Sequence, residues 1–239
     1  MKLLELPEQV LLGKREYGFF EDFLDFVSGD LFTDTSGDTG AAVANVDAAG
    51  GQVTLTTGGT DNNECYLLTT KEPLKIADDK PIVFGARLKF SEANTDDANV
   101  AAGVMNAVGA DSIVDNGAGL KTNFSGAAFY KVDGGTNWKV MASDGATQSW
   151  NVELTAANSL DKVAKVAASS AFQDLRIEIM PISSTKAEVR FFIDDTLVYK
   201  FADVTFANAT EMNAFVGNKA GGANSEVCTV DYVYAYQLR

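Results

Sequence analysis

Apolar and polar residues alternate along much of this chain with the two-residue period of β-strands. The clearest case is residues 172–201, where three strand-length apolar runs are separated by short polar breaks. In the first run, from Leu175 to Ile179, aliphatic residues alternate with charged ones, which predicts one buried and one wet face. The second break is Asp194-Asp195, a two-residue connection typical of a tight hairpin. The segment is therefore predicted to form an antiparallel meander.

A hairpin that turns at Asp194-Asp195 fixes which residues face each other across its two strands. The predicted pairs are Phe192 with Leu197, Arg190 with Tyr199, and Glu188 with Phe201. This register leaves an apolar face opposite to the core face, made of Phe192, Leu197, Tyr199 and Phe201. That face is interpreted either as covered by a loop of its own domain or as partner-binding, in a subunit interface or a ligand groove.

The rest of the chain repeats this pattern in about thirteen short segments with Gly, Asp and Asn at the breaks. The prediction is an all-β sandwich of two antiparallel sheets. One segment, Asn158–Ser170, has helical spacing, so at most one short helix is expected. In the last strand the alternation predicts that five residues share one face, namely Cys228, Val230, Tyr232, Tyr234 and Tyr236.

The N-terminus differs from this pattern, and we divide the chain into an arm, residues 1–18, and a sandwich domain, residues 19–239. The arm holds large aliphatic residues with no clean period: Leu3, Leu4, Leu6, Val10, Leu11 and Leu12. Two interpretations stay open, an arm that packs on its own domain and an arm that docks on a partner. Glu5, Pro7 and Glu8 interrupt any signal-peptide apolar region, so export by such a signal is not expected.

Composition removes several function classes. The net charge of −14 would repel a phosphate backbone, so nucleic-acid binding is not expected. The chain has no histidine, which removes the usual general base and the usual metal ligand. No apolar run approaches the ~20 residues of a membrane helix. Two cysteines, Cys65 and Cys228, fall in an early and a late strand, and we expect reduced thiols, with a disulfide as the alternative.

Two loops and three aromatic residues are the remaining candidates for ligand chemistry. The loops hold oxygen donors that suit calcium: Glu92, Asn94, Asp96, Asp97 and Asn99 in one, and Asp111, Asp115 and Asn116 in the other. Neither loop has EF-hand spacing, so ordinary solvated loops are the alternative and no cofactor is assigned. The aromatic candidates for sugar stacking are Tyr130, Trp138 and Trp150, although a Trp in a meander strand usually belongs to the core.

The order of the segments resembles the concanavalin A-like jelly roll, the fold of legume lectins, laminin-G-type domains and many glucanases. The resemblance covers roughly residues 20–239 and rests on Gly50–Gly58, Phe84–Phe90, Leu175–Ile179, Phe191–Val198 and Val230–Val233. It implies a jelly-roll β-sandwich. Such domains usually carry Asp-Gly at the hairpin turn, where this chain has Asp195 in place of the glycine.

Glucanases of this fold carry clustered carboxylates on one strand, in a pattern like E-x-D-x-x-E, because hydrolysis needs a general acid and a nucleophile at a fixed separation. The corresponding strand here, Arg176–Met180, has the single carboxylate Glu178. No Ser/His or Cys/His arrangement can form without histidine. The chain is therefore predicted not to be an enzyme.

Two segments look like those of tailed-phage virion proteins with this fold, residues 50–64 (GGQVTLTTGGTDNNE) and 86–105 (ARLKFSEANTDDANVAAGVM). That resemblance implies a capsid decoration or cement protein, a homotrimer that binds and stabilises the major capsid protein shell after assembly in the host cytoplasm. The arm and the face at Phe192 would then be the partner-binding residues. The alternative is a carbohydrate-binding or host-recognition module on a phage particle, for which glycan is the ligand.

Overall fold

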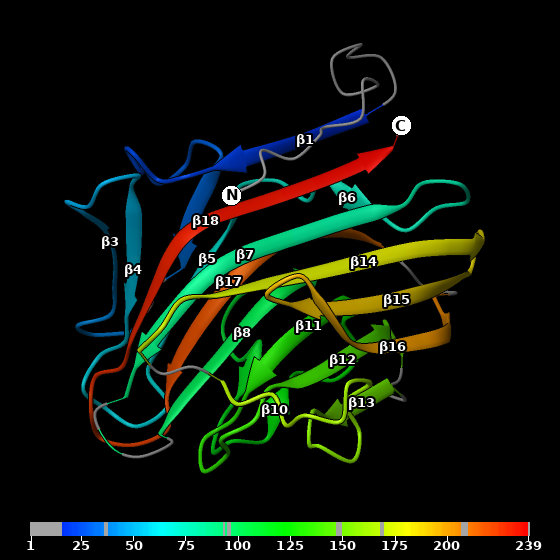
Figure 1. The fold of residues 1–239 in the computed structure, drawn as a ribbon. Coiled ribbons are helices and arrows are strands. Elements are labelled where there is room, and N and C mark those ends of the chain that lie inside the picture. Colours follow the sequence, from blue (N-terminus) through cyan, green and yellow to red (C-terminus); the bar gives the residue numbers. More distant parts are fainter. Residues whose placement is uncertain are drawn as a thin grey trace.

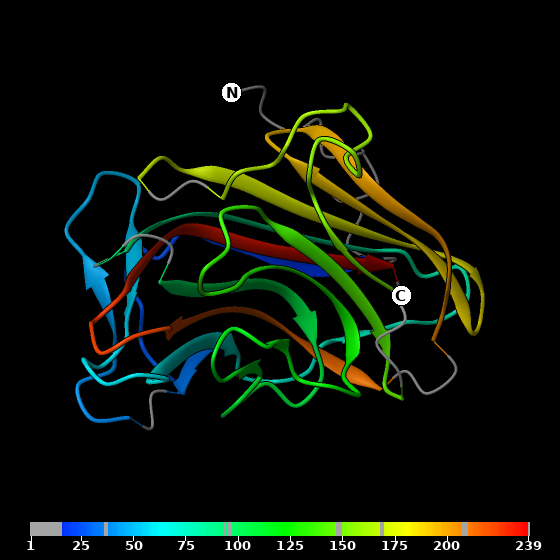
Figure 2. The same cartoon turned by 90° about the horizontal axis from the view of Figure 1, so that it is seen from below.

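The computed structural model describes residues 16–35, 38–92, 94, 97–146, 150–167, 170–206 and 210–238. Two large antiparallel sheets form the two layers of a sandwich (Figures 1 and 2). The described part of the chain contains no α-helix, and none of its segments is a helix long and apolar enough to cross a membrane. The predicted all-β sandwich is confirmed.

The first sheet lies nearer the viewer in Figure 1 and is called here the back sheet. It has the strand order β16-β15-β14-β7-β18-β4-β3, with β1 paired to β18. Its strands are β1 (Glu16–Glu21), β3 (Ala42–Val46), β4 (Gln52–Thr56), β7 (Ile82–Ser91), β14 (Gln173–Ser183), β15 (Lys186–Ile193), β16 (Thr196–Thr205) and β18 (Val227–Leu238). Figure 1 shows β1, β18, β7 and β14 side by side.

The second sheet, called here the front sheet, has the order β13-β12-β11-β8-β17-β5-β2, with β6 paired to β17. Its strands are β2 (Phe32–Thr35), β5 (Glu64–Thr69), β6 (Leu74–Lys75), β8 (Ala98–Met105), β11 (Ser125–Lys131), β12 (Lys139–Asp144), β13 (Trp150–Glu153) and β17 (Glu211–Ala220). A separate two-stranded hairpin, β9 (Ile113–Val114) with β10 (Gly119–Leu120), lies between β8 and β11 in the sequence.

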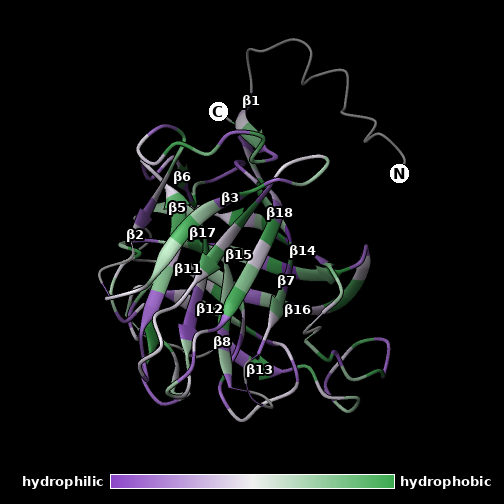
Figure 3. Ribbon diagram, turned by 90° about the vertical axis from the view of Figure 1, so that its left-hand side faces the viewer, coloured by the Kyte–Doolittle hydropathy of each residue, from purple (hydrophilic) through white to green (hydrophobic). Residues whose placement is uncertain are grey.

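The inner faces of the two sheets enclose one apolar core, and the strands that supply it carry most of the hydrophobic residues (Figure 3). Leu175, Ile177 and Ile179 of β14 all point into it, as their alternation predicts. Phe191 of β15 packs edge-on against Phe129 of β11 with ring centroids 5.2 Å apart. Burying each such side chain contributes roughly 1.5–3 kcal/mol, which makes this layer the main source of stability.

The turn of the β15–β16 hairpin is as predicted, with Asp194 and Asp195 at φ 49° and 62°, and Phe192 pairs with Leu197. The predicted register fails beyond that pair because bulges interrupt β16. The observed pairs are Arg190 with Lys200 and Val189 with Phe201. Phe201 therefore turns into the core and is 8% exposed, which corrects its assignment to the outer face.

The predicted face of the last strand is also wrong. The pairing of β18 with β7 shifts between Val230 and Tyr232, so Asp231 is an extra residue in β18. Cys228 and Val230 point into the core before the bulge, whereas Tyr232 and its successors at alternate positions point out of the sandwich after it. One inserted residue exchanges the two faces of a strand because the side-chain period is two.

The helix predicted at Asn158–Ser170 is absent from the described part of that segment, which stops at residue 167 and resumes at 170. Its backbone groups bond to neighbouring segments instead: Leu160 donates to Val198 and Lys165 to the carbonyl of Leu154. In this short stretch, hydrogen bonds to neighbouring segments thus override the weak helix preference of the sequence.

The six aliphatic residues of the predicted arm, Leu3, Leu4, Leu6, Val10, Leu11 and Leu12, lie outside the described residues. The sheet itself starts at Glu16, which pairs with Leu238, two residues before the predicted end of the arm. Cys65 and Cys228 are buried free thiols, as expected. Burial raises the pKa of Cys228 to about 12 and also raises the pKa of Cys65, so both remain protonated at neutral pH.

Candidate functional site

The outer face of the front sheet is covered by the chain itself. The segment of residues 106–124, which contains the β9–β10 hairpin, lies over it and buries a second apolar cluster. That cluster comprises Tyr66, Leu68, Ala101, Met105, Ile113, Leu120, Phe124, Ala128, Tyr130, Val132, Met141 and Phe215. Because all of these residues are buried, the cover keeps solvent away from this part of the outer face.

Buried polar groups attach this cover to the sheet. Lys219 of β17 has a side chain only 1% exposed, and its Nζ lies 3.1 Å from Glu64 Oε2, 3.2 Å from Asp111 Oδ1 and 2.5 Å from Asp115 Oδ1. The same Nζ donates to the carbonyl of Ile113 at 2.9 Å. Burial lowers the pKa of Lys219, but its bonds to Asp115 and Glu64 outweigh that effect and the pKa is raised. The cover is therefore held by a buried ammonium with carboxylates around it.

Tyr66 completes this attachment. Its hydroxyl donates to Glu64 Oε2 at 2.6 Å and accepts from the backbone N–H of Ile113 at 2.9 Å. Burial and the neighbouring charge of Glu64 raise the tyrosine pKa well above its ordinary value. The phenol thus stays neutral and bridges the sheet to β9.

The loop carboxylates considered for calcium serve mainly as partners of lysines. Lys131, 1% exposed, has its Nζ 2.6 Å from Glu92 Oε1 and donates to the Ala98 carbonyl at 2.9 Å. Asn99 accepts from the N–H of Asp133 at 2.8 Å, and Asp96 lies outside the described residues. Within the described ranges, no group of three or more acidic or cysteine side chains is arranged to hold a metal ion.

The predicted stacking aromatics do not form an exposed surface. Trp138 is fully buried, packs edge-on against Phe90 and Phe129, and donates from Nε1 to Gln173 Oε1 at 2.8 Å. Tyr130 is 3% exposed and belongs to the apolar cluster under the cover. Trp150 is partly buried and packs against the main core.

The outer face of the back sheet is different, because a row of aromatic rings runs along β18 on this face. Phe20 of β1 and Tyr232, Tyr234 and Tyr236 of β18 form this aromatic row. Successive ring centroids are 5.4, 6.2 and 5.8 Å apart, and successive ring planes are inclined by 35°, 31° and 37°. Each ring is thus tilted against the next, and Phe20 is 56% exposed.

Two glycines allow the rings to lie against the sheet. A Cβ added at Gly85 of β7 would lie 2.3 Å from Cζ of Tyr234, and one added at Gly18 of β1 would lie 2.3 Å from Cδ1 of Tyr236. The phenol ring of Tyr234 therefore occupies the space above the backbone of β7. The close approach of this ring to β7 requires a glycine there, because a Cβ at Gly85 would overlap the ring.

Charged side chains border the aromatic row. Tyr232 donates from its hydroxyl to Asp174, and burial followed by this bond raises its pKa above the ordinary value. Arg87 Nη1 lies 2.5 Å from Asp231 Oδ2, while Arg176 lies 4.1 Å from the ring centre of Phe192. Burial raises the pKa of Tyr234 to about 12, so the tyrosines offer neutral hydroxyls at physiological pH.

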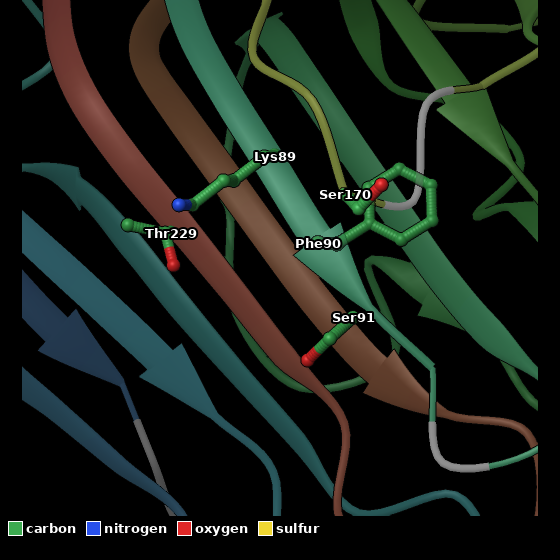
Figure 4. Close-up of a pocket in the computed structure, with 5 residues that line it drawn as sticks. All are labelled: Lys89, Phe90, Ser91, Ser170 and Thr229. Atoms are coloured by element: carbon green, nitrogen blue, oxygen red, sulfur yellow. The ribbon is translucent and has the colours of Figure 1, made fainter.

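A hollow of about 250 Å³ opens on the same sheet beyond Tyr232 (Figure 4). It is lined by Lys89, Phe90, Ser91, Ser170 and Thr229. In the pairing of β7 with β18, Lys89 faces Thr229 and Arg87 faces Tyr232. The hollow therefore continues the line of the aromatic row along the same two strands.

Three of the predicted partner-binding residues of the hairpin, Phe192, Leu197 and Tyr199, are partly exposed. Phe192 carries Arg176 on its ring, whereas Tyr199 packs at the margin of the core, edge-on to Phe201 at 5.1 Å. The sequence reasoning missed the aromatic row itself. The available signal was the small, aliphatic pair Val233 and Ala235, which compete with the tyrosines for the inward positions.

Comparison with known proteins places the fold in the concanavalin A-like, legume-lectin type of β-sandwich. A glucuronan lyase, endo-β-1,4-glucuronan lyase from the fungus Trichoderma reesei, superposes with a TM-score of 0.63 at 11% identity over 91% of this chain and 94% of that one. Peanut lectin superposes with a TM-score of 0.59 at 14% identity, over 94% of this chain and 98% of the lectin. The metal-free Emp46p carbohydrate recognition domain superposes with a TM-score of 0.57 at 11% identity, over 90% of this chain and 94% of the domain. The same domain has also been solved with potassium bound.

At these identities the likeness concerns the fold alone. No protein-family model matches the chain, and no curated protein matches it in sequence. The resemblance inferred from the order of the segments is thus confirmed at the level of the jelly roll. The phage context is not shown.

Proposed function

We propose that this protein is a non-catalytic carbohydrate-binding module that binds a glycan on the aromatic row of the back sheet. The observation that carries the proposal is the row itself, in which Phe20, Tyr232, Tyr234 and Tyr236 lie next to one another on the outside of the sandwich with ring centroids 5.4–6.2 Å apart. The C–H faces of pyranose rings are apolar and electropositive, so they stack on the electron-rich faces of aromatic rings.

The border of the row supplies the second element of sugar recognition. A glycan stacked on the rings needs donors and acceptors at its edges for its hydroxyl groups. Arg87, Asp174 and Arg176 provide them from β7 and β14, and the tyrosine hydroxyls add neutral ones. The covered front sheet also supports the proposal, since its outer face is filled by residues 106–124.

The fold is also that of carbohydrate recognition domains and lectins, which supports the proposal only by analogy. The same fold also occurs in a lyase, so the fold alone does not distinguish binding from catalysis. Glycoside hydrolysis requires one carboxylic acid with a raised pKa beside a second carboxylate. Glu178 lies 3.7 Å from both Arg176 and Arg190, and the hydrogen bond from Arg190 lowers the pKa of Glu188. The carboxylates of Glu178 and Glu188 are therefore suited to ion pairing rather than to acid catalysis.

The capsid decoration suggested by the sequence resemblance stays a prediction, as do the homotrimer and the location in a virion. Several of the structural likenesses are to lectins, to a carbohydrate recognition domain and to a glucuronan lyase, and these favour the glycan alternative. Copurification of the protein at high copy number with a capsid shell, without retention on any glycan, would favour the capsid prediction instead.

The test is affinity gel electrophoresis of the full chain in gels that contain soluble β-glucans, xylans, mannans or polyuronates. We expect retardation by at least one polysaccharide and its loss in Tyr234→Ala. The matched control is Leu160→Ala, which removes a side chain that is 48% exposed outside the aromatic row. Retardation that persists unchanged in Tyr234→Ala, or no retardation with any polysaccharide, would contradict the proposal.

A further inference from the structure

We infer that the hollow beside the aromatic row binds the carboxylate of a uronic acid unit, so that the preferred ligand is an acidic polysaccharide. The inference rests on the proposed function, because it takes the aromatic row as the place where the sugar chain lies. It adds the chemical class of the glycan and assigns a role to Lys89, which lines the hollow together with Thr229 (Figure 4).

Lys89 forms no ion pair with a carboxylate of the described residues. Its ammonium lies 4.6 Å from the centre of the Phe172 ring and, among the described residues, forms no ion pair. Its neighbours differ in this respect: Arg87 is bonded to Asp231, and Arg176 lies 3.7 Å from Glu178. The net charge of −14 repels anions at long range, so an anionic ligand needs a local cation, and Lys89 is one that forms no ion pair within the described residues.

The rest of the lining suits a carboxylate. Ser91, Ser170 and Thr229 also line the hollow, and a serine or threonine hydroxyl can donate to a carboxylate oxygen. A hydrogen bond from an ammonium to a carboxylate is roughly twice as strong as one between neutral groups. At about 250 Å³, the hollow is smaller than the ~300–1,000 Å³ of a pocket for a whole small molecule, so it accepts a substituent of a chain that continues outside.

Strand geometry places the hollow and the aromatic row on one line. Gly85, Arg87 and Lys89 are successive outward positions of β7, which are about 6.8 Å apart along a strand. They face Tyr234, Tyr232 and Thr229 respectively. A sugar chain stacked on the tyrosines would therefore pass Arg87 and bring its next unit to Lys89. The aromatic row holds the chain and the hollow selects its charge.

The charges around this line do not oppose an anion. Asp231 is only 16% exposed in its side chain and is engaged by Arg87 Nη1, while Asp174 accepts from Tyr232 and lies 3.9 Å from Arg87 Nε. Both carboxylates are thus held by donors of the protein. Phe172 packs under both Arg87 and Lys89, at 4.6 Å from each cation, which keeps the two positive groups on the same side.

The experiment compares two ligands that differ only in the carboxylate, namely oligomers of β-1,4-linked glucuronic acid and of β-1,4-linked glucose of equal length, titrated into the full chain by calorimetry. We expect the uronic oligomer to bind about tenfold more tightly at low salt, and the difference to shrink as salt is added. Lys89→Gln should remove this preference, whereas Lys89→Arg should keep it. Lys71→Gln, which removes an exposed charge elsewhere, is the matched control.

The possible results separate the inference from the proposed function. Equal binding of both oligomers that is lost in Tyr234→Ala would overturn the inference and leave carbohydrate binding standing. Binding of the uronic oligomer that Lys89→Gln leaves unchanged would also overturn it. No binding of either oligomer, with self-association that disappears in Tyr234→Ala, would overturn both and make the aromatic row an interface between copies of this chain.

Discussion

The outer faces of the two sheets differ in how the chain covers them. On the front sheet, residues 106–124 cover the strands, and buried Lys219 attaches that cover through Glu64, Asp111 and Asp115. On the back sheet no segment of the described chain covers the aromatic row, and Phe20 is more than half exposed. The comparison shows that one outer face is closed by the chain itself, whereas the other keeps partly exposed aromatic rings among the described residues.

The largest expected effect comes from removing the ammonium that holds the cover. Lys219→Met leaves the carboxylate of Glu64, which is 10% exposed in its side chain, without its counter-ion. Breaking a buried pair in this way costs about 3–5 kcal/mol. We expect that loss in urea unfolding, with faster amide exchange in residues 106–124. Lys75→Met, which removes an exposed pair with Glu211, should cost under ~1 kcal/mol; an equal loss in both variants would contradict the role of Lys219.

Alkaline pH should open the same cover without mutation. The pKa values of Lys219 and Tyr66 are both raised in the folded protein. A raised pKa contributes stability below the unfolded value, near 10 for both groups, and this contribution is lost as the pH rises through the folded values. We expect stability to fall above pH ~10 by up to about 1.4 kcal/mol per pH unit for each group. A melting temperature that is flat from pH 9 to about 11.5 would contradict this prediction.

A smaller effect is expected where the aromatic row rests on β7. Gly85→Ala places a Cβ in the space of the Tyr234 ring, whose outer end can swing away, so the free energy of unfolding should change by about 1 kcal/mol. Glycan binding should nevertheless weaken, because the ring leaves its neighbours. Gly59→Ala, where a Cβ meets nothing within 4 Å, should alter neither quantity. Affinity gels and thermal melts of the two variants make the comparison.

Phe20→Ala should separate binding from stability most cleanly. Its side chain is 56% exposed, so its removal should change the free energy of unfolding by no more than about 0.5 kcal/mol. The variant should still bind glycan severalfold more weakly, since one ring of the aromatic row is lost. Unaltered affinity would restrict the binding surface to the three tyrosines of β18.

The smallest expected effect concerns the N-terminal arm. The sequence predicts that its aliphatic residues attach the protein to a partner, with packing on its own domain as the alternative. Deletion of residues 1–15 retains β1, which starts at Glu16, and should leave the melting temperature within about 2 °C of the full chain. Early melting of the truncated chain would favour the packed arm.

Much of the fold could be predicted because its signals are local. Leu175, Ile177 and Ile179 alternate with polar residues, and such alternation determines a half-buried strand wherever it lies. Asp194 and Asp195 adopt the left-handed turn that a two-residue hairpin requires, and Phe192 and Leu197 pair beside it as predicted. The preference of residues for turns and the two-residue alternation of strands each depend on only a few neighbouring residues. Both can therefore be recognised in the sequence alone.

The candidate site depended on events that are not local. The extra residue Asp231 puts Tyr232, Tyr234 and Tyr236 on the outside instead of on one face with Cys228 and Val230, as the alternation predicted. A bulge is decided by the pairing of two strands rather than by one. Lys219 is buried because Glu64, Asp111 and Asp115, more than a hundred residues earlier in the chain, meet its ammonium. The sequence by itself determined the strands and their turns. Only the tertiary structure decided which outer face the described chain covers and which side chains it leaves exposed, because register and burial are set by partners distant in the chain.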